Sequence, residues 1–331
     1  MSISEHSDPP VGPPPSGTQQ ATYRNPVYED YFADPFVLAW EGGYLAYGTG
    51  SVIDGRMFEV LHSVDLARWT RVGGAMELLP VELGTDCWAP EVVEADGQFW
   101  LYYSVGVGDR RHHLRVAAAD SPLGPFRDLG VNLTPDELFA IDPHPFQDVD
   151  GRWYLYYARD VLTGDRVGTH LAVAELTTMS ALSGPGRPVL APTADWQIFE
   201  RGRAIYEGTH DWHTLEGPNV RRHAGIYYCI YSGGSYLGEG YHAAWASAPH
   251  PLGPWTEPPG DRGRLLATVL GRVRGPGHNS VVTTNGGTDM LVYHAWNAAG
   301  TRRQMCIDPL FWTADGPSTP GPSWTEQSLP S

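Results

Sequence analysis

One motif recurs five times along this chain, and the repeat limits its fold more than any other feature. Each copy has a short apolar stretch, a turn that contains glycine, and an aromatic or aliphatic run, as in AIDPHPFQDVDGRWYLYYA at residues 140–158. The other copies are ADPFVLAWEGGYLAYGT from residue 33, CWAPEVVEADGQFWLYYS from 87, EGPNVRRHAGIYYCIYS from 216 and GHNSVVTTNGGTDMLVYHAW from 277. Such self-similarity is typical of proteins built from one repeated supersecondary unit.

A turn glycine in each copy sets the register between the copies. These glycines are Gly43, Gly97, Gly151, Gly225 and Gly287. The residues nine positions before them are Asp34, Trp88, Asp142, Glu216 and His278. We expect these five residues to occupy one structural position in five equivalent units.

The run after each turn is apolar on both faces of a strand. In the second copy Phe99, Leu101 and Tyr103 alternate with Trp100 and Tyr102, so both faces of the sheet must be covered. A sheet stacked between two like sheets meets this need, and no segment carries a long helical period. The pattern therefore predicts an all-β, five-bladed β-propeller whose first strands line a central channel.

The propeller is expected to fill most of the chain as a single catalytic domain over residues 23–316. Residues 1–22 are rich in proline, serine and glycine and are expected to be a disordered tail. Residues 317–331 are expected to form a loosely attached C-terminal tail. The long stretch 177–213, which precedes Glu216, is expected to form a wall of the pocket.

Charge and cysteine content exclude several classes of partner and chemistry. All 22 basic residues are arginine, and 38 acidic residues bring the net charge to -16, so nucleic acid and anionic membranes are poor partners. The absence of lysine excludes Schiff-base chemistry. Three scattered cysteines form no CxxC pair, and no secretory leader or membrane-spanning run is visible, so a cytoplasmic location is expected.

Three of the five equivalent residues are carboxylates that would meet in one channel. Clustered like charges are costly to desolvate, and no nucleophile elbow, phosphate loop or metal-binding histidine pair accompanies them. Glycoside cleavage needs one protonated and one ionised acid. Asp142 and Glu216 lie on neighbouring blades, so one of them should keep its proton to unusually high pH, while Asp34 should stay ionised as a base or nucleophile.

The motifs ADP, WAP, IDP, EGP and GHN, in this order, resemble those of glycoside hydrolase family 43, which contains arabinofuranosidases, xylosidases and arabinanases. The resemblance extends from about residue 25 to 316. It implies that Asp34 is the general base, that Glu216 is the general acid, and that Asp142 orients substrate and tunes the acid. It also implies inversion of configuration. The Arg-Asp-Pro and Glu-Cys motifs of the related fructan-cleaving families are replaced here by IDP and EGP.

Other candidate residues surround these three. Trp88 would stack on a sugar or pack at the channel rim. His278 resembles a family histidine that in some members holds a hydrated calcium ion, so a structural calcium ion is an alternative to a site that needs no cofactor. Arg303 resembles a late arginine that reaches sugar hydroxyls, although Arg302 stands beside it. Glu91 is expected to lie on its strand rather than in the site.

We therefore expect an exo-acting, inverting hydrolase that removes terminal α-L-arabinofuranosyl residues from arabino- or arabinoxylo-oligosaccharides. A β-D-xylosidase acting on xylo-oligosaccharides is the nearest alternative. An endo-arabinanase would need an open groove, and a non-catalytic propeller that binds glycans or proteins is the last alternative. The expected partner is a small oligosaccharide, and no sequence feature marks an oligomeric interface.

Overall fold

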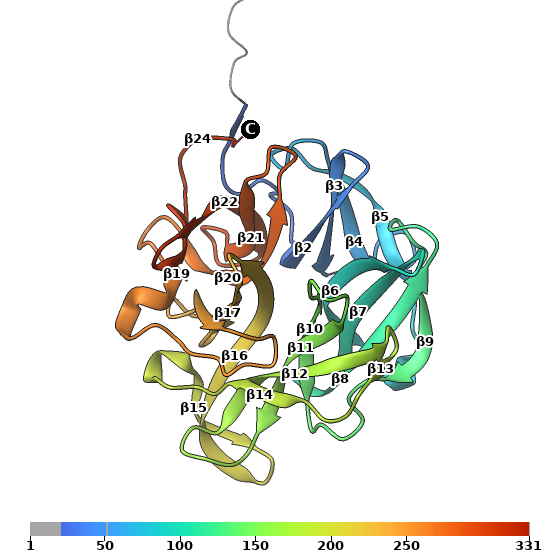
Figure 1. Cartoon of the computed structure of the whole chain (residues 1–331), viewed down its shortest axis with the longest axis vertical. Helices are drawn as coiled ribbons and strands as arrows, with labels where there is room; N and C mark the ends of the chain where they lie inside the picture. Colours follow the sequence, from blue (N-terminus) through green and yellow to red (C-terminus); the bar gives the residue numbers. More distant parts are fainter. Residues whose placement is uncertain (1–20, 51, 331) are drawn as a thin grey trace, which may run out of the picture.

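The computed structural model describes residues 21–50 and 52–330, which form five β-sheet blades arranged as a ring around a central channel (Figure 1). The innermost strands β2, β6, β10, β16 and β20 surround the middle of the ring in Figure 1. The prediction of an all-β, five-bladed propeller is thus confirmed. Within the described residues, no helix is long and apolar enough to cross a membrane.

Blades one, two and five are antiparallel four-stranded sheets whose strands follow one another in sequence. Blade one contains β2 (Ala33–Trp40), β3 (Gly43–Thr49), β4 (Arg56–Ser63) and β5 (Thr70–Glu77). Blade two contains β6 (Asp86–Ala95), β7 (Gln98–Val107), β8 (Arg110–Ala119) and β9 (Arg127–Asn132). Blade five contains β20 (Arg274–Thr283), β21 (Asp289–Trp296), β22 (Arg303–Thr313) and β23 (Gly316–Ser318).

Blades three and four are joined by a short parallel pairing of β12 with β16. Blade three contains β10 (Ala140–Gln147), β11 (Trp153–Val161) and β12 (Gly168–Thr178), with β13 (Ala181–Leu182) and β14 (Arg187–Leu190) beside β12. Blade four contains β16 (Gly208–His223), β17 (Ile226–Gly233), β18 (His242–Ala248) and β19 (Arg264–Leu266). A further strand, β15 (Ile198–Ile205), forms a hairpin with the first part of β16. The short 3₁₀ helices are η1 (Val81–Leu83), η2 (Asp195–Gln197) and η3 (Gly260–Gly263).

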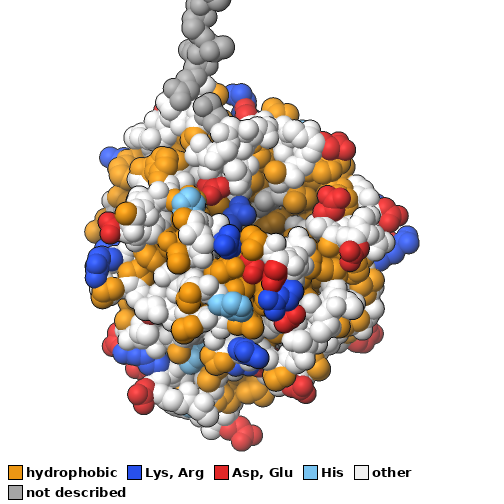
Figure 2. Space-filling view, in the orientation of Figure 1, with side chains coloured by type: hydrophobic (Ala, Val, Ile, Leu, Met, Phe, Trp, Pro, Cys, Tyr) orange, Lys and Arg blue, Asp and Glu red, His pale blue; other side chains and the backbone are white. Residues whose placement is uncertain are grey.

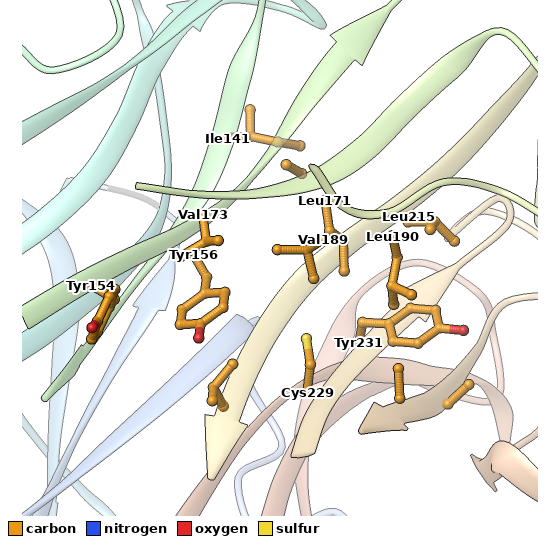
Figure 3. Close-up of a cluster of buried hydrophobic side chains, with 14 of the residues drawn as sticks. Ile141, Tyr154, Tyr156, Leu171, Val173, Val189, Leu190, Leu215, Cys229 and Tyr231 are labelled. Carbon is orange, nitrogen blue, oxygen red and sulfur yellow. The ribbon is translucent and has the colours of Figure 1, made fainter. Parts of the chain in front are cut away.

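Hydrophobic cores lie between the blades, which explains why the second strands are apolar on both faces. Leu101 and Tyr103 pack with Tyr47 of blade one, whereas Tyr102, between them in sequence, packs with Leu155 of blade three. Figure 3 shows the corresponding core between blades three and four. Full burial of such side chains contributes about 1.5–3 kcal/mol each, so the ring is stabilised mainly at the five blade interfaces.

The five equivalent positions differ by one residue from the predicted register in two blades. In every inner strand a residue with a left-handed backbone conformation lies at a bulge that interrupts the pairing with the second strand. These residues are Asp34 (φ 51°), Ala89 (φ 47°), Asp142 (φ 58°), Gly217 (φ 56°) and His278 (φ 47°). Trp88 and Glu216 therefore precede the equivalent position, and the prediction that they occupy it is wrong.

Turn length explains the error. Blades one, two and four have two-residue turns in which both residues have positive φ, as the tightest β-hairpins require. Blades three and five have longer turns, over residues 148–152 and 284–288. Nine residues before Gly151 or Gly287, in the longer turns, is the equivalent position, but nine before Gly97 or Gly225 is one residue too many. Blade one escaped the error because the count began at Gly43, one residue after its turn.

The left-handed residue turns its backbone N–H toward the preceding blade. Asp34 donates to Nδ1 of His294 at 3.2 Å, and Gly217 donates to Oδ2 of Asp142 at 2.9 Å. Equivalent bonds run from Ala89 to Thr49 (2.7 Å) and from His278 to Ser232 (2.8 Å). Left-handed non-glycine residues cost of order 1–3 kcal/mol and cluster at functional sites. The bulges therefore indicate that the functional site lies at the channel entrance.

The C-terminal segment is not the loosely attached tail that the sequence predicted. Strand β24 (Gln327–Ser328) pairs with β1 (Thr22–Tyr23). Nearby, the Asn25 side chain donates to Oγ of Ser323 at 3.0 Å, and the Ser323 N–H donates to Asp308 of blade five at 3.0 Å. The segment thus fastens the start of the domain to blade five and helps to close the ring. The predicted disorder of 1–22 falls, up to residue 20, outside the described residues.

Candidate active site

The three carboxylates predicted as catalytic meet at the entrance of the channel. Asp34 and Asp142 lie on the inner strands β2 and β10 and are 8% and 6% exposed. Nδ1 of His278 lies 3.3 Å from Oδ1 of Asp34 and 4.0 Å from Oδ2 of Asp142. Glu216 immediately precedes Gly217, whose N–H binds Asp142. The ring therefore brings side chains that are far apart in sequence around one small volume.

Asp34 is surrounded by nitrogen atoms. Arg303 donates from Nη1 to its Oδ1 at 2.9 Å, and His278 and His294 both contact the same oxygen. Burial alone would raise the pKa of Asp34, but the Arg303 charge, followed by the two histidines, holds it well below its usual range. Asp34 is therefore ionised over the whole neutral range, as the sequence predicted.

Glu216 has the opposite environment. Its Oε1 accepts a hydrogen bond from the Tyr241 hydroxyl at 2.6 Å, and within the described part of the chain no cation lies within ion-pair distance of it. Burial, and then the negative charge of Asp142, raise the pKa of Glu216 to about 7. A carboxylic acid with such a pKa can hold a proton near neutral pH and donate it to a leaving group.

Asp142 shares negative charge with Glu216. Burial raises the pKa of Asp142 to about 6, while the positive charge of His278 opposes the rise. Asp142 also accepts the Gly217 N–H, a bond that favours its ionised form. Of the two neighbouring acids, Glu216 is therefore the one that keeps the proton. The motifs' residues alone had left open whether Asp142 or Glu216 does so.

A small cavity lies just inside the entrance. It has a volume of about 10 Å³, enough for about one water molecule, and its lining includes Asp34, Asp142, His278 and Asn279. The side-chain amide of Asn279 is buried, and neither of its polar atoms has a hydrogen-bond partner in the described structure. A water molecule would satisfy that amide.

The donor set around this cavity does not fit a directly coordinated calcium ion. Among residues 21–50 and 52–330 there is no group of three or more carboxylate, histidine or cysteine side chains suited to hold a metal. Burial alone would lower the pKa of His278, but the charges of the three carboxylates raise it. The proton that these carboxylates favour on His278 would compete with a cation for the imidazole.

Comparison with known proteins identifies the family. A family model described as glycosyl hydrolases family 43 matches residues 23–317. This chain belongs to glycosyl hydrolase family 43. Since members of this family are inverting glycoside hydrolases, the predicted enzyme class is confirmed.

Several relatives match over most of the chain. The β-D-galactofuranosidase xynD of Aspergillus niger is 28% identical, over 89% of this chain and 84% of its own length. The extracellular exo-α-(1→5)-L-arabinofuranosidase of Streptomyces avermitilis is 26% identical, over 96% of this chain and 65% of its own length. The crystal structure of a thermostable family-43 glycoside hydrolase is 31% identical and superposes with a TM-score of 0.82, covering 94% of this chain and all of that one.

In this family-43 domain the structure separates the two neighbouring arginines. The Arg303 side chain is only 13% exposed, contacts Asp34 and donates from Nη2 to the Tyr31 hydroxyl at 3.0 Å. Arg302 is exposed and pairs with Asp30 outside the channel. The candidate Arg303 is therefore in the site, whereas Arg302 is not.

Trp88 and Glu91 differ in their relation to the site. Trp88 is half-buried, and its ring stacks on His112 with centroids 3.8 Å apart, so one face of the indole is already covered. Glu91 faces the channel, lines the small cavity and contacts His144 at 2.7 Å. Glu91 was expected to lie on its strand and outside the site. It does lie on β6, but it also lines the small cavity next to the catalytic carboxylates.

Sequence reasoning missed three residues of the site. Tyr241 binds Glu216, His294 contacts Asp34, and Tyr236 lies under the Arg303 guanidinium at 4.8 Å from the ring centroid. His294 could have been found, since it interrupts the apolar run LVYHAW of a second strand. Tyr236 and Tyr241 belong to the loop after β17 and have no local signal of this kind.

The stretch 177–213 does approach the site at one point. Phe199 in β15 lies 6.3 Å from Tyr236 between ring centroids. Arginine and acidic side chains gather near the middle of the face in Figure 2. That this stretch forms a wall of the pocket stays a prediction.

Proposed function

We propose that this protein is an exo-acting, inverting glycosidase that removes terminal α-L-arabinofuranosyl residues from short arabino- or arabinoxylo-oligosaccharides. The observation that carries the assignment of roles is the contrast between Asp34, with a strongly lowered pKa, and Glu216, with a raised one. An inverting glycosidase needs this pair of protonation states at the same pH.

In the proposed reaction, Glu216 is the general acid and Asp34 the general base. Asp34 accepts a proton from a water molecule, and the water oxygen forms a bond to the anomeric carbon from the face opposite the leaving group. The glycosidic C–O bond breaks as Glu216 gives its proton to the leaving oxygen. The released sugar thus has inverted configuration, and both carboxyl groups return to their starting states by exchanging protons with solvent.

Asp142 supports this reaction without forming a bond to the sugar. Its charge keeps the pKa of Glu216 high, and its bond to the Gly217 N–H fixes the backbone next to Glu216. His278, between Asp34 and Asp142, is proposed to hold the two carboxylates apart in a fixed geometry. Arg303 and Trp88 are proposed to contact sugar at the rim.

The choice of arabinofuranose is supported by the relatives. The two relatives described above by sequence are named for furanosides, galactofuranose in one case and arabinofuranose in the other. A β-D-galactofuranosidase is therefore a second candidate. The β-xylosidase alternative also remains, because a relative from Humicola insolens that is 29% identical is named a xylosidase/arabinosidase.

A set of chromogenic substrates tests the assignment. We expect the highest kcat/KM on p-nitrophenyl α-L-arabinofuranoside, with lower values on the β-D-xyloside and the β-D-galactofuranoside. A preference for either of the other sugars would replace the proposed one. No release from any of them, nor from arabino- or xylo-oligosaccharides, would favour a non-catalytic binding propeller. Proton NMR of the first-formed anomer tests inversion directly.

Two further properties are proposed with their tests. The site is proposed to need no metal, so dialysis against EDTA should leave kcat/KM unchanged, and a loss restored by calcium would contradict this. A cytoplasmic location is proposed, supported by three free, buried cysteines. Fractionation of the producing cells should find the activity with cytoplasmic markers.

A further inference from the structure

The β15–β16 hairpin reaches from blade four to blade two. Nη2 of Arg203, on β15, forms an ion pair with Oδ2 of Asp109. Asp109 lies in the turn between β7 and β8 of blade two. This turn is on the entrance side of the channel, because Gly108 in it donates to Asp86 at the start of inner strand β6. Blade three, which lies between blades two and four, is spanned by this contact.

Arg203 is held more firmly than a surface arginine. Its side chain is 11% exposed, and its guanidinium lies 5.2 Å from the Phe199 ring centroid and 5.4 Å from that of Trp212. Its Nε also faces Glu200 at 3.6 Å. Arg201, two residues earlier on the same strand, is 63% exposed and pairs with Asp211 within the hairpin. The buried position and aromatic neighbours distinguish Arg203 as a fixed point of the hairpin.

The hairpin is also anchored to blade three. The Tyr206 hydroxyl, near the hairpin tip, donates to Oδ2 of Asp160 at 2.8 Å. Asp160 is buried on β11 and accepts a second bond from Thr169 at 2.8 Å. The hairpin is therefore attached to blades two and three as well as to its own blade.

Contacts lead from this hairpin to the catalytic carboxylates. Phe199, against which Arg203 packs, lies beside Tyr236. Tyr236 lies under Arg303, and Arg303 binds Asp34. A shift of Phe199 would consequently reach Tyr236 and, through Arg303, the carboxylate of Asp34.

We propose that the Arg203–Asp109 ion pair is a clasp that makes the pocket blind on its blade-three side and so determines that the enzyme cleaves only chain ends. Arg203 is a positioning residue, because it holds Phe199 and the hairpin and does not itself contact substrate. This inference rests on the proposed function. With the clasp closed, a polysaccharide that runs across the entrance meets the hairpin between blades two and four, so only a terminal residue can enter.

Product analysis on linear arabinohexaose tests the clasp. Arg203→Ala and Asp109→Ala each remove one partner, and Arg201→Ala is the matched control from the same strand. Wild type and Arg201→Ala should release only the monosaccharide at early conversion. Both clasp variants should release di- and trisaccharides from the start, with the ratio of internal to terminal cleavage raised about tenfold. Asp109 is exposed, so its variant keeps the test valid if Arg203→Ala fails to fold.

The outcomes separate the clasp from the proposed function. Monosaccharide as the sole early product of both folded clasp variants would overturn the clasp, and so would internal cleavage by the wild type. A wild type that cleaves xylohexaose and not arabinohexaose would refute the proposed sugar, and the same variants would then be compared on xylohexaose. A wild type that cleaves neither would refute both proposals.

Discussion

The hydroxyl of Tyr241 donates a hydrogen bond to Oε1 of Glu216 at 2.6 Å. The Tyr241 ring also stacks on His294, with centroids 5.9 Å apart and planes only 3° from parallel. Since His294 contacts Asp34 and both rings are fully buried, one stacked pair braces the proposed acid and the proposed base. The distance between the two carboxyl groups is therefore set by packing as well as by the backbone.

Replacing Tyr241 by phenylalanine should shift the pH profile. In the wild type the hydrogen bond from Tyr241 favours the ionised form of Glu216. Without this bond the pKa of Glu216 should rise, and the basic limb of kcat/KM should move to higher pH by up to about one unit. Tyr227→Phe is the control, because Tyr227 makes a similar bond to Asp148 away from the site. A basic limb that stays in place in Tyr241→Phe would contradict this role.

Neutralising Asp142 should move the same limb in the opposite direction. The Asp142 charge raises the pKa of Glu216, so in Asp142→Asn the acid should lose its proton at lower pH and activity should decline earlier as pH rises. The exposed Asp150→Asn, in the same blade, should leave the profile unchanged. An unaltered basic limb in Asp142→Asn would show that the charge of Asp142 does not raise the pKa of Glu216.

Arg303 should control the acidic limb. Arg303→Met removes the cation that holds the pKa of Asp34 down, so Asp34 should be protonated at higher pH and the acidic limb should shift upward. Arg302→Met is a matched control, since Arg302 is the adjacent residue but pairs with Asp30 at the surface. Equal shifts in both variants would indicate a general charge effect in place of a local one.

Loss of the proposed acid should depend on the leaving group. In Glu216→Gln, hydrolysis of natural oligosaccharides should fall by about 10²–10⁴-fold, because no proton is delivered to the leaving oxygen. Aryl glycosides with acidic phenols need less protonation and should retain much more of their rate. Equal losses on both substrate types would argue that Glu216 has a different role.

The ring closure can be tested through stability. Asn25 donates to the Ile307 carbonyl at 2.7 Å and accepts from the Ile307 N–H at 2.8 Å, besides its contact with Ser323. Asn25→Ala should lower the free energy of unfolding by about 1–3 kcal/mol, which calorimetry or denaturant unfolding would detect. The exposed Asn285→Ala should change it by less than about 0.5 kcal/mol. No difference between the two variants would show that the Asn25 contacts with blade five and Ser323 contribute little to ring closure.

The repeat made the fold and the main site predictable. Alternating apolar runs such as FWLYYS require cover on both faces, and five of them in series leave a ring of stacked sheets as the simplest arrangement. The acids on the inner strands were then expected to converge, and His278 contacts both Asp34 and Asp142. The one-residue register error arose because the sequence does not give turn length. Gly97 and Gly225 end two-residue turns, whereas Gly151 and Gly287 lie inside longer ones.

What the sequence alone determined is what a local pattern can encode: strand identity, blade number and the acids that the inner strands carry. Tertiary structure decided which partners those acids have, because the contacts join residues far apart in the chain. Asp34 and His294 are separated by 260 positions, and Arg203 and Asp109 by 94. Protonation states and pocket shape depend on burial and on such distant neighbours, and no periodicity in the chain records them.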